Sequence, residues 1–132
     1  MPIATGTFEV NMAPQAGSPA EGADAIARFV LDKSYAGDLT ATGRGQMLAS
    51  RTAVDGSAGY VAIEHIEGKL AGHEGGFVIQ HFGIMDRGSP TLHVPIIPDS
   101  GTGNLAGISG ELTIDIEEDG SHSYTLTYEL PV

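Results

Sequence analysis

Residues 111–130 read ELTIDIEEDGSHSYTLTYEL, a pattern that is typical of a β-hairpin. Every second residue is apolar within 112–116 and within 124–130, and the residues between them are polar. Successive side chains of a strand point to opposite faces, so each run has an apolar inner face and a polar outer face. The residue types of Asp119-Gly120, between the two runs, favour a tight turn.

The rest of the chain repeats this organisation. Its 19 Gly and 7 Pro lie mainly between short runs rich in Val, Ile, Thr, Phe and Tyr, which indicates antiparallel strands joined by turns. Residues 23–31 are a competing signal, because their apolar side chains also fit one face of a helix. We expect an all-β protein with eight strands, at Ala4–Val10, Ala25–Tyr35, Leu39–Ser50, Gly59–Leu70, Gly76–Met85, Thr91–Ile97, Glu111–Glu117 and His122–Leu130.

Length and charge restrict the class of protein. The chain has 132 residues, which is enough for a single domain spanning 1–132. Its net charge of -11 repels phosphate backbones and anionic lipids, so we expect neither nucleic-acid nor membrane partners. The chain has no Cys, and its first residues, MPIAT, lack the basic and apolar regions of a signal peptide. We therefore expect a cytoplasmic protein.

Two connections are longer than tight turns. Residues 11–24 are rich in Ala, Pro and Gly, and they are expected to cross the mouth of a barrel or to act as a lid. Residues 98–110 contain four Gly, so this second connection can fold back tightly.

Four segments resemble an uncharacterised family of small bacterial proteins: ATGTFEV at 4–10, FVIQH at 77–81, PDSGTGNLAGISG at 98–110 and YTLTY at 124–128. That family is assigned a barrel similar to those of plant allene oxide cyclase and the dirigent proteins. The resemblance implies a single eight-stranded antiparallel barrel, allene oxide cyclase-like, whose closure removes unpaired strand edges. It implies a fold rather than an activity, because barrels of this shape have many functions.

Glu64 is the most informative residue. Every second residue within 60–70, starting at Tyr60, belongs to a mostly apolar set that includes Glu64 and is expected to face inward. An unpaired buried carboxylate is costly. Glu64 is therefore expected to be a catalytic group with a raised pKa. The alternatives are a residue at the barrel rim, or a structural ion pair with an arginine such as Arg28, Arg44 or Arg51.

His81 is the candidate partner of Glu64. A two-residue turn at Gly72-His73 places His81 directly opposite Glu64, close enough for contact. A three-residue loop instead places Phe82 opposite Glu64, turns His81 outward and gives Gln80 the inward position. The apolar residues of this strand fit both registers. An inward Glu and His pair could act as base and proton carrier near neutral pH.

Tyr60, Tyr124 and Tyr128 are also expected to face inward. They are either ordinary core aromatics or the lining of an apolar cavity with hydroxyl tips. The small inward residues expected between Leu39 and Ala49 suit a filled, tapering barrel as well as a hollow one. The candidate ligand-binding residues are Tyr60, Gln80, Tyr124 and Tyr128.

We expect neither a metal nor a cofactor. The Gly-rich segment 101–107 has neither the spacing nor the strand-helix context of a nucleotide-binding loop, and the five His lack metal-binding spacing. An alternative is a zinc or iron site built across strands, for instance from Glu64, His81 and His93.

The expected function is the binding of a small apolar ligand inside the barrel. One form of it is a cofactor-free isomerase, cyclase or lyase with Glu64 and His81 as catalytic residues, which holds a flexible substrate and excludes water. The alternatives are a non-catalytic carrier or sensor, and a filled barrel that acts through its outer surface or a dimer interface. A symmetric homodimer is a reasonable expectation, although no strand has an obvious apolar outer face.

Overall fold

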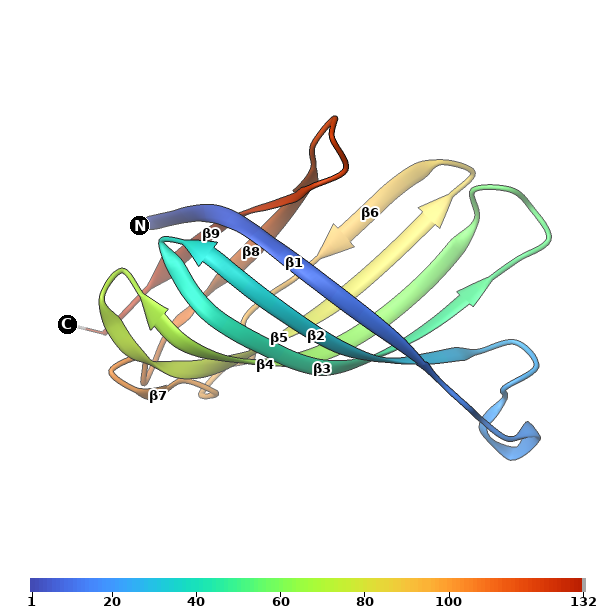
Figure 1. The fold of residues 1–132 in the computed structure, drawn as a ribbon, viewed down its shortest axis with the longest axis horizontal. Helices are drawn as coiled ribbons and strands as arrows, with labels where there is room; N and C mark the ends of the chain where they lie inside the picture. Colours follow the sequence, from blue (N-terminus) through green and yellow to red (C-terminus); the bar gives the residue numbers. More distant parts are fainter. Residues whose placement is uncertain (132) are drawn as a thin grey trace.

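The computed structural model describes residues 1–131, and most of them form one antiparallel sheet that curls into a nearly closed barrel (Figure 1). The strands along the barrel wall follow the order β6-β5-β4-β3-β2-β1-β9-β8, which confirms the all-β, eight-stranded prediction. The elements are β1 (Ile3–Gln15), the 3-10 helix η1 (Pro19–Glu21), β2 (Ala27–Gly37), β3 (Leu39–Arg51), β4 (Ala58–Leu70), β5 (His73–Asp86), β6 (Ser89–His93), β7 (Thr102–Gly103), β8 (Ser109–Ile116) and β9 (His122–Glu129).

Three local predictions differ from the structure. The expected loop at 11–24 is shorter, because β1 continues to Gln15 in register with β2. The helical alternative at 23–31 is wrong, since β2 begins at Ala27 and pairs on both edges. The two-residue strand β7 was not predicted, and it pairs with β5 off the main path. In the described residues the longest helix, η1, has three residues, too few to cross a membrane.

The barrel is closed at one end and open at the other. Residues following β6 complete the wall at the closed end, where Ile96 N–H donates to Gly110 C=O at 2.9 Å and Leu112 N–H donates to Val94 C=O at 2.9 Å. At the other end β9 begins opposite Phe8, so the last seven residues of β1 pair with β2 alone. This leaves an opening between β1 and β6 on the right side of Figure 1.

The closed end is filled with side chains. Its core consists of alternating inward residues from most strands, the segment after β6 and the loop after β7: Ala4, Phe8, Tyr35, Leu39, Ile66, Leu70, Phe77, Ile79, Val94, Ile96, Leu105, Ile108, Leu112, Tyr124, Leu126 and Tyr128. The inward faces predicted for β3, β4 and β9 are confirmed by this burial. Of the two outcomes left open, a filled barrel therefore describes this end.

Candidate functional site

Three ionisable side chains are buried together where the filled core meets the open end. Glu64 on β4 is 0% exposed, Lys33 on β2 is 5% exposed and His81 on β5 is 3% exposed. Each belongs to the inward-facing set of its strand, so ordinary strand alternation brings them into the barrel. Charged side chains are seldom buried to this extent unless they are paired.

Glu64 makes two close contacts, one with each carboxylate oxygen. Lys33 Nζ lies 2.7 Å from Glu64 Oε1, and the Tyr35 hydroxyl donates a hydrogen bond of 2.5 Å to Oε2. Gly43 on β3 provides the space for this carboxylate, because a Cβ atom there would lie 2.0 Å from Oε2. The Lys33 ammonium is also 5.0 Å from the centre of the Phe8 ring, within the range of a cation–π contact.

These contacts reverse the expected titration of Glu64. Burial acts to raise the pKa of Glu64, but the adjacent His81 imidazole and Lys33 ammonium outweigh it, and the Tyr35 hydroxyl acts in the same direction. The pKa of Glu64 is consequently lowered, and the prediction of a raised value is wrong. Burial and the Glu64 charge raise the pKa of Tyr35, so its hydroxyl remains a donor. The structural ion pair exists, but with Lys33 rather than with an arginine.

His81 connects this ion pair to the open end. Its Nε2 lies 3.5 Å from Glu64 Oε1, and its Nδ1 lies 3.2 Å from the Tyr60 hydroxyl. Within residues 1–131, neither His81 Nε2 nor Glu64 Oε1 has a hydrogen-bond partner of good geometry. Both atoms therefore retain hydrogen-bonding capacity in a buried place, which is uncommon in native proteins.

The hairpin between β4 and β5 has neither of the predicted registers. Leu70 pairs with His73 across a two-residue turn, Ala71-Gly72, so Glu64 lies opposite Ile79 and His81 lies opposite Ala62. Ala71 and Gly72 both have positive φ, of 49° and 85°, as a tight hairpin turn requires. Alanine is not a typical residue there, so the sequence did not indicate this turn. The shift of two positions keeps His81 on the inward face, one diagonal step from Glu64.

Tyr60 is the member of the cluster nearest the opening. It is half-buried on β4, and its ring packs against Gly83 on β5, where a Cβ atom would lie 2.3 Å from a ring carbon. Burial and the Glu64 charge raise the pKa of the Tyr60 phenol, so it is protonated at neutral pH. The polar groups thus form a series from the opening inward: Tyr60, His81, Glu64 and Lys33.

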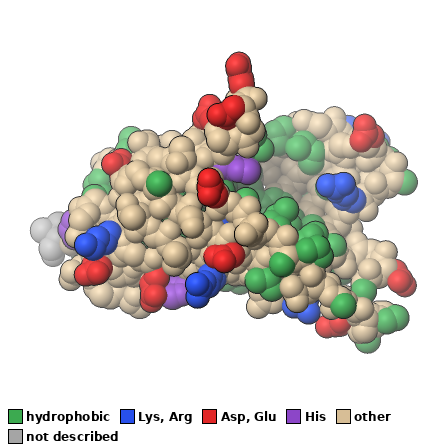
Figure 2. Space-filling model, viewed as in Figure 1, with side chains coloured by type: hydrophobic (Ala, Val, Ile, Leu, Met, Phe, Trp, Pro, Cys, Tyr) green, Lys and Arg blue, Asp and Glu red, His purple; other side chains and the backbone are tan. Residues whose placement is uncertain are grey.

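Apolar side chains line the inward face of the open end, which Tyr60 borders. Four of them face inward yet are exposed, which is the reverse of an ordinary core: Met12, Met85, Leu92 and Ile116. Phe29 and Met47 are half-buried beside them. Figure 2 looks toward this region and shows hydrophobic side chains gathered along a hollow to the right of the barrel body. The open end is therefore an apolar trough with polar groups at its inner limit.

The other predicted ligand-binding residues lie elsewhere. Gln80 is exposed on the outer face of β5, so the inward position that the alternative register gave it is wrong. Tyr124 faces inward as predicted, but its hydroxyl accepts a hydrogen bond of 2.9 Å from Leu39 N–H and donates one of 3.0 Å to Ala36 C=O. Tyr128 is buried in the filled core. Of the four candidates, Tyr60 alone borders the trough.

The alternative metal site is not assembled. The side chain of His93 is 64% exposed, and its Nδ1 lies 3.7 Å from Glu111 Oε1, whereas Glu64 and His81 are buried inside. Across residues 1–131, no three His, Asp or Glu side chains are grouped closely enough to hold a metal ion.

Sequence reasoning missed Lys33 and Tyr35. Both lie in the run Phe29, Leu31, Lys33 and Tyr35, whose alternate positions face inward on β2. The parity argument used for Glu64 would have found Lys33 as a cation between apolar inward neighbours. The competing helical pattern at 23–31 overlaps the start of this strand and obscures its alternation.

Comparison with known proteins places the chain in a family. The model of a family described as "Protein of unknown function (DUF3224)" matches residues 4–128. A solved structure of a protein with unknown function from the DUF3224 family, from Shewanella oneidensis MR-1, is 44% identical with a TM-score of 0.92, covering 100% of this chain and 98% of that one. A search of curated proteins found no match. The chain therefore belongs to the DUF3224 family.

Proposed function

We propose that the open end of the barrel binds a small, mostly apolar molecule that carries at least one hydrogen-bonding oxygen. The observation that carries this proposal is the set of inward-facing but exposed apolar side chains at the open end of the barrel. Ligand sites are commonly apolar concavities with a few well-placed polar groups. The trough combines both features, because the Tyr60 hydroxyl and the buried His81 lie at its inner limit.

The polar series suits proton transfer at the ligand oxygen. We assign the form of His81 in which Nε2–H points toward Glu64 and Nδ1–H points toward the Tyr60 oxygen, which leaves the Tyr60 hydroxyl proton free for the ligand oxygen. In this arrangement Tyr60 gives its proton to the ligand oxygen and receives the Nδ1 proton of His81 in its place. Glu64 is too buried to touch the ligand, so its role is to fix the imidazole, and Lys33 keeps Glu64 ionised. Glu64 is a positioning residue here, rather than the base that the sequence suggested.

The reaction class that fits is a cofactor-free isomerisation, cyclisation or elimination of a flexible apolar substrate. The trough would hold the substrate in a reactive conformation and exclude water, while Tyr60 polarises one oxygen. The resemblance of the sequence to a family assigned a barrel like those of allene oxide cyclase and the dirigent proteins supports this reading as an analogy of fold.

A non-catalytic carrier is the second candidate. One observation favours it: the carboxylate of the series is already paired with Lys33, and its pKa is lowered, so it is a weak base. A carrier needs only the apolar walls and the Tyr60 hydroxyl as a donor.

Native mass spectrometry of freshly purified protein tests the binding proposal and yields the ligand. We expect a bound small molecule that is lost in Leu92→Lys, which puts a charge into the trough, and kept in Ile3→Lys, a matched change outside it. A wild-type protein that carries no molecule and also fails to bind apolar probes would refute the proposal. With the ligand in hand, Tyr60→Phe separates the two candidates: an enzyme retains binding but loses turnover, whereas a carrier shows no turnover in either form.

A further inference from the structure

The outer face of the four central strands carries an apolar patch that the sequence did not reveal. It consists of six exposed side chains on β2 to β5, namely Val30, Leu48, Val61, Ile63, Phe82 and Ile84. Leu48, Val61 and Phe82 lie directly beside one another across β3, β4 and β5. Each strand contributes only one or two of these residues, so the patch becomes visible only when the register is known. It lies on the side of the sheet away from the trough.

We propose that this patch is the interface of a symmetric homodimer, in which a second copy of the chain packs face to face across it. The distribution of charge makes this patch the surface on which two copies repel one another least. The chain has a net charge of -11, so two copies repel one another over most of their surfaces. The outward positions at the patch carry no acidic residue. They are Arg28 and Val30 on β2, Gln46, Leu48 and Ser50 on β3, Gly59, Val61 and Ile63 on β4, and Gln80, Phe82 and Ile84 on β5.

The register also makes the patch complementary to itself. A two-fold axis that runs along the strands between β3 and β4 reverses the strand order, so β3 faces β4 of the other copy and β2 faces its β5. Because Arg28, Leu48, Val61 and Phe82 are cross-strand neighbours, this operation sets Leu48 on the partner subunit's Val61. It sets Arg28 on the partner subunit's Phe82, a pairing of guanidinium and aromatic ring that is favourable in proteins.

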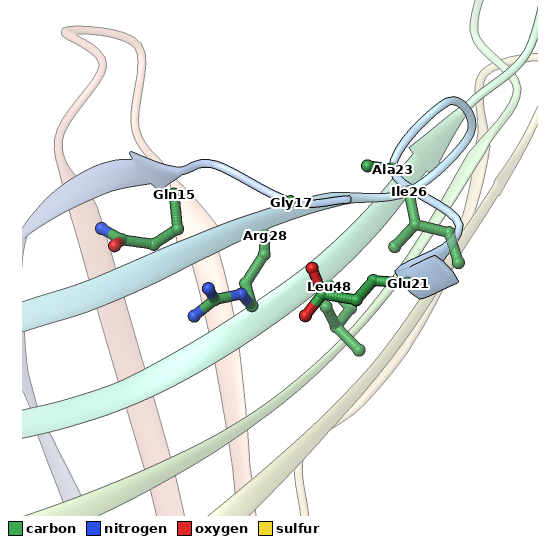
Figure 3. Close-up of a pocket in the computed structure, with 7 residues that line it drawn as sticks. All are labelled: Gln15, Gly17, Glu21, Ala23, Ile26, Arg28 and Leu48. Carbon is green, nitrogen blue, oxygen red and sulfur yellow. The ribbon is translucent and has the colours of Figure 1, made fainter. Parts of the chain in front are cut away.

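A hollow at the edge of the patch lies where the proposed axis brings another patch side chain, Ile84. Figure 3 shows the residues that line this hollow, which has a volume of about 280 Å³: Arg28 comes from β2, Leu48 from β3, Glu21 from η1, and Ala23 and Ile26 from the residues between η1 and β2. Ile26 is exposed and precedes β2, one row along from Arg28. The same two-fold operation directs the partner subunit's Ile84 toward Ile26 at the rim of this hollow, so two apolar side chains meet there.

Sedimentation analysis from low to high micromolar concentration tests the proposal. We expect wild-type protein to form a dimer and nothing larger, because an isologous interface closes on itself. Added salt should strengthen the dimer, since it screens the repulsion between acidic copies. Val61→Lys places like charges near the axis and should abolish the dimer, whereas Ile3→Lys, an exposed apolar residue on β1, should leave it intact. A monomeric wild type, a larger assembly, or equal dissociation by both substitutions would overturn the proposal.

Exchanging the side chains of Arg28 and Phe82 tests whether these two residues pair across the interface. Phe82→Arg alone sets arginine against arginine and should raise the dissociation constant at least tenfold, roughly the effect of losing one favourable contact. The double variant Arg28→Phe with Phe82→Arg restores the pairing in exchanged positions and should recover the dimer. All these side chains are on the outer surface, so circular dichroism should show an unchanged fold. If the double variant dissociates as much as Phe82→Arg, the proposed axis is wrong.

Discussion

Glu64→Gln is expected to destabilise the protein by about 3–5 kcal/mol at neutral pH, the cost of breaking a buried ion pair by removing one partner. The substitution preserves the shape of the side chain, and the Tyr35 hydroxyl can still donate to the amide oxygen. It removes the charge that compensates the Lys33 ammonium, which is 5% exposed. The Phe8 ring at 5.0 Å does not replace the lost charge, because this cation–π contact, which contributes about 2 kcal/mol when desolvated, is already present in the wild type.

Urea unfolding monitored by circular dichroism measures this effect directly. With a typical slope of about 2 kcal/mol per molar urea, a loss of 4 kcal/mol lowers the midpoint by about 2 M. Glu67→Gln is the matched control, because Glu67 is on the same strand, exposed, and 4.0 Å from His65. An exposed pair of this kind contributes little, so the control midpoint should stay nearly unchanged.

A second variant distinguishes the loss of charge compensation from a general intolerance of β4. Adding Lys33→Met to Glu64→Gln removes the orphaned ammonium and should recover most of the lost stability, since buried ion pairs can be replaced by apolar residues at little cost. The reasoning fails if Glu64→Gln alone costs less than about 1 kcal/mol, or if the double variant is no more stable than the single one.

Three further outcomes follow from the same contacts. The contribution of Glu64 to wild-type stability should be fully present above the unfolded Glu pKa of about 4.3 and be lost as the pH falls from there through the lowered folded pKa of Glu64, and Glu64→Gln should lack this component in an acid titration of its midpoint. Tyr124→Phe leaves the buried Leu39 N–H without its acceptor and should cost about 1–3 kcal/mol in thermal or urea unfolding. Gly83→Ala directs a methyl group into the Tyr60 ring. We expect it to reduce the binding free energy of the co-purifying molecule by more than it reduces the free energy of unfolding. The opposite order of effects would show that Tyr60 does not contact the ligand.

The sequence predicts which segments form strands and which of their side chains face inward, because both depend on local alternation. The inward sets of β3, β4 and β9 follow from a period of two, and a local pattern is enough to place Glu64 inside. The partners of Glu64 required more, since they come from strands whose register depends on turns. The Ala71-Gly72 turn places an alanine at positive φ, a choice that tertiary context permits but that local preference does not indicate.

The same limit explains what the sequence missed on both faces of the sheet. Lys33 lies within contact distance of Glu64, although 31 positions separate them along the chain and no local pattern links them. The outer patch is assembled from single exposed residues on four strands, so each strand by itself resembles an ordinary solvated surface. The closed and open ends of the barrel also arise from pairing, because β9 is shorter than β1.

The buried polar series is better explained by the geometry it imposes than by stability. A buried ion pair is weak evidence for stability, because apolar residues of similar size are often as good or better. The chain also places Gly43 and Gly83 within strands, where glycine weakens pairing, and each makes room for one member of the series: Gly43 for the Glu64 carboxylate and Gly83 for the Tyr60 ring. The chain therefore departs from two local preferences, against glycine within strands and against buried charge, and both departures serve the same arrangement of side chains. Such departures are expected where side chains must hold a fixed geometry for function, and they coincide with the place where the filled core gives way to the apolar trough.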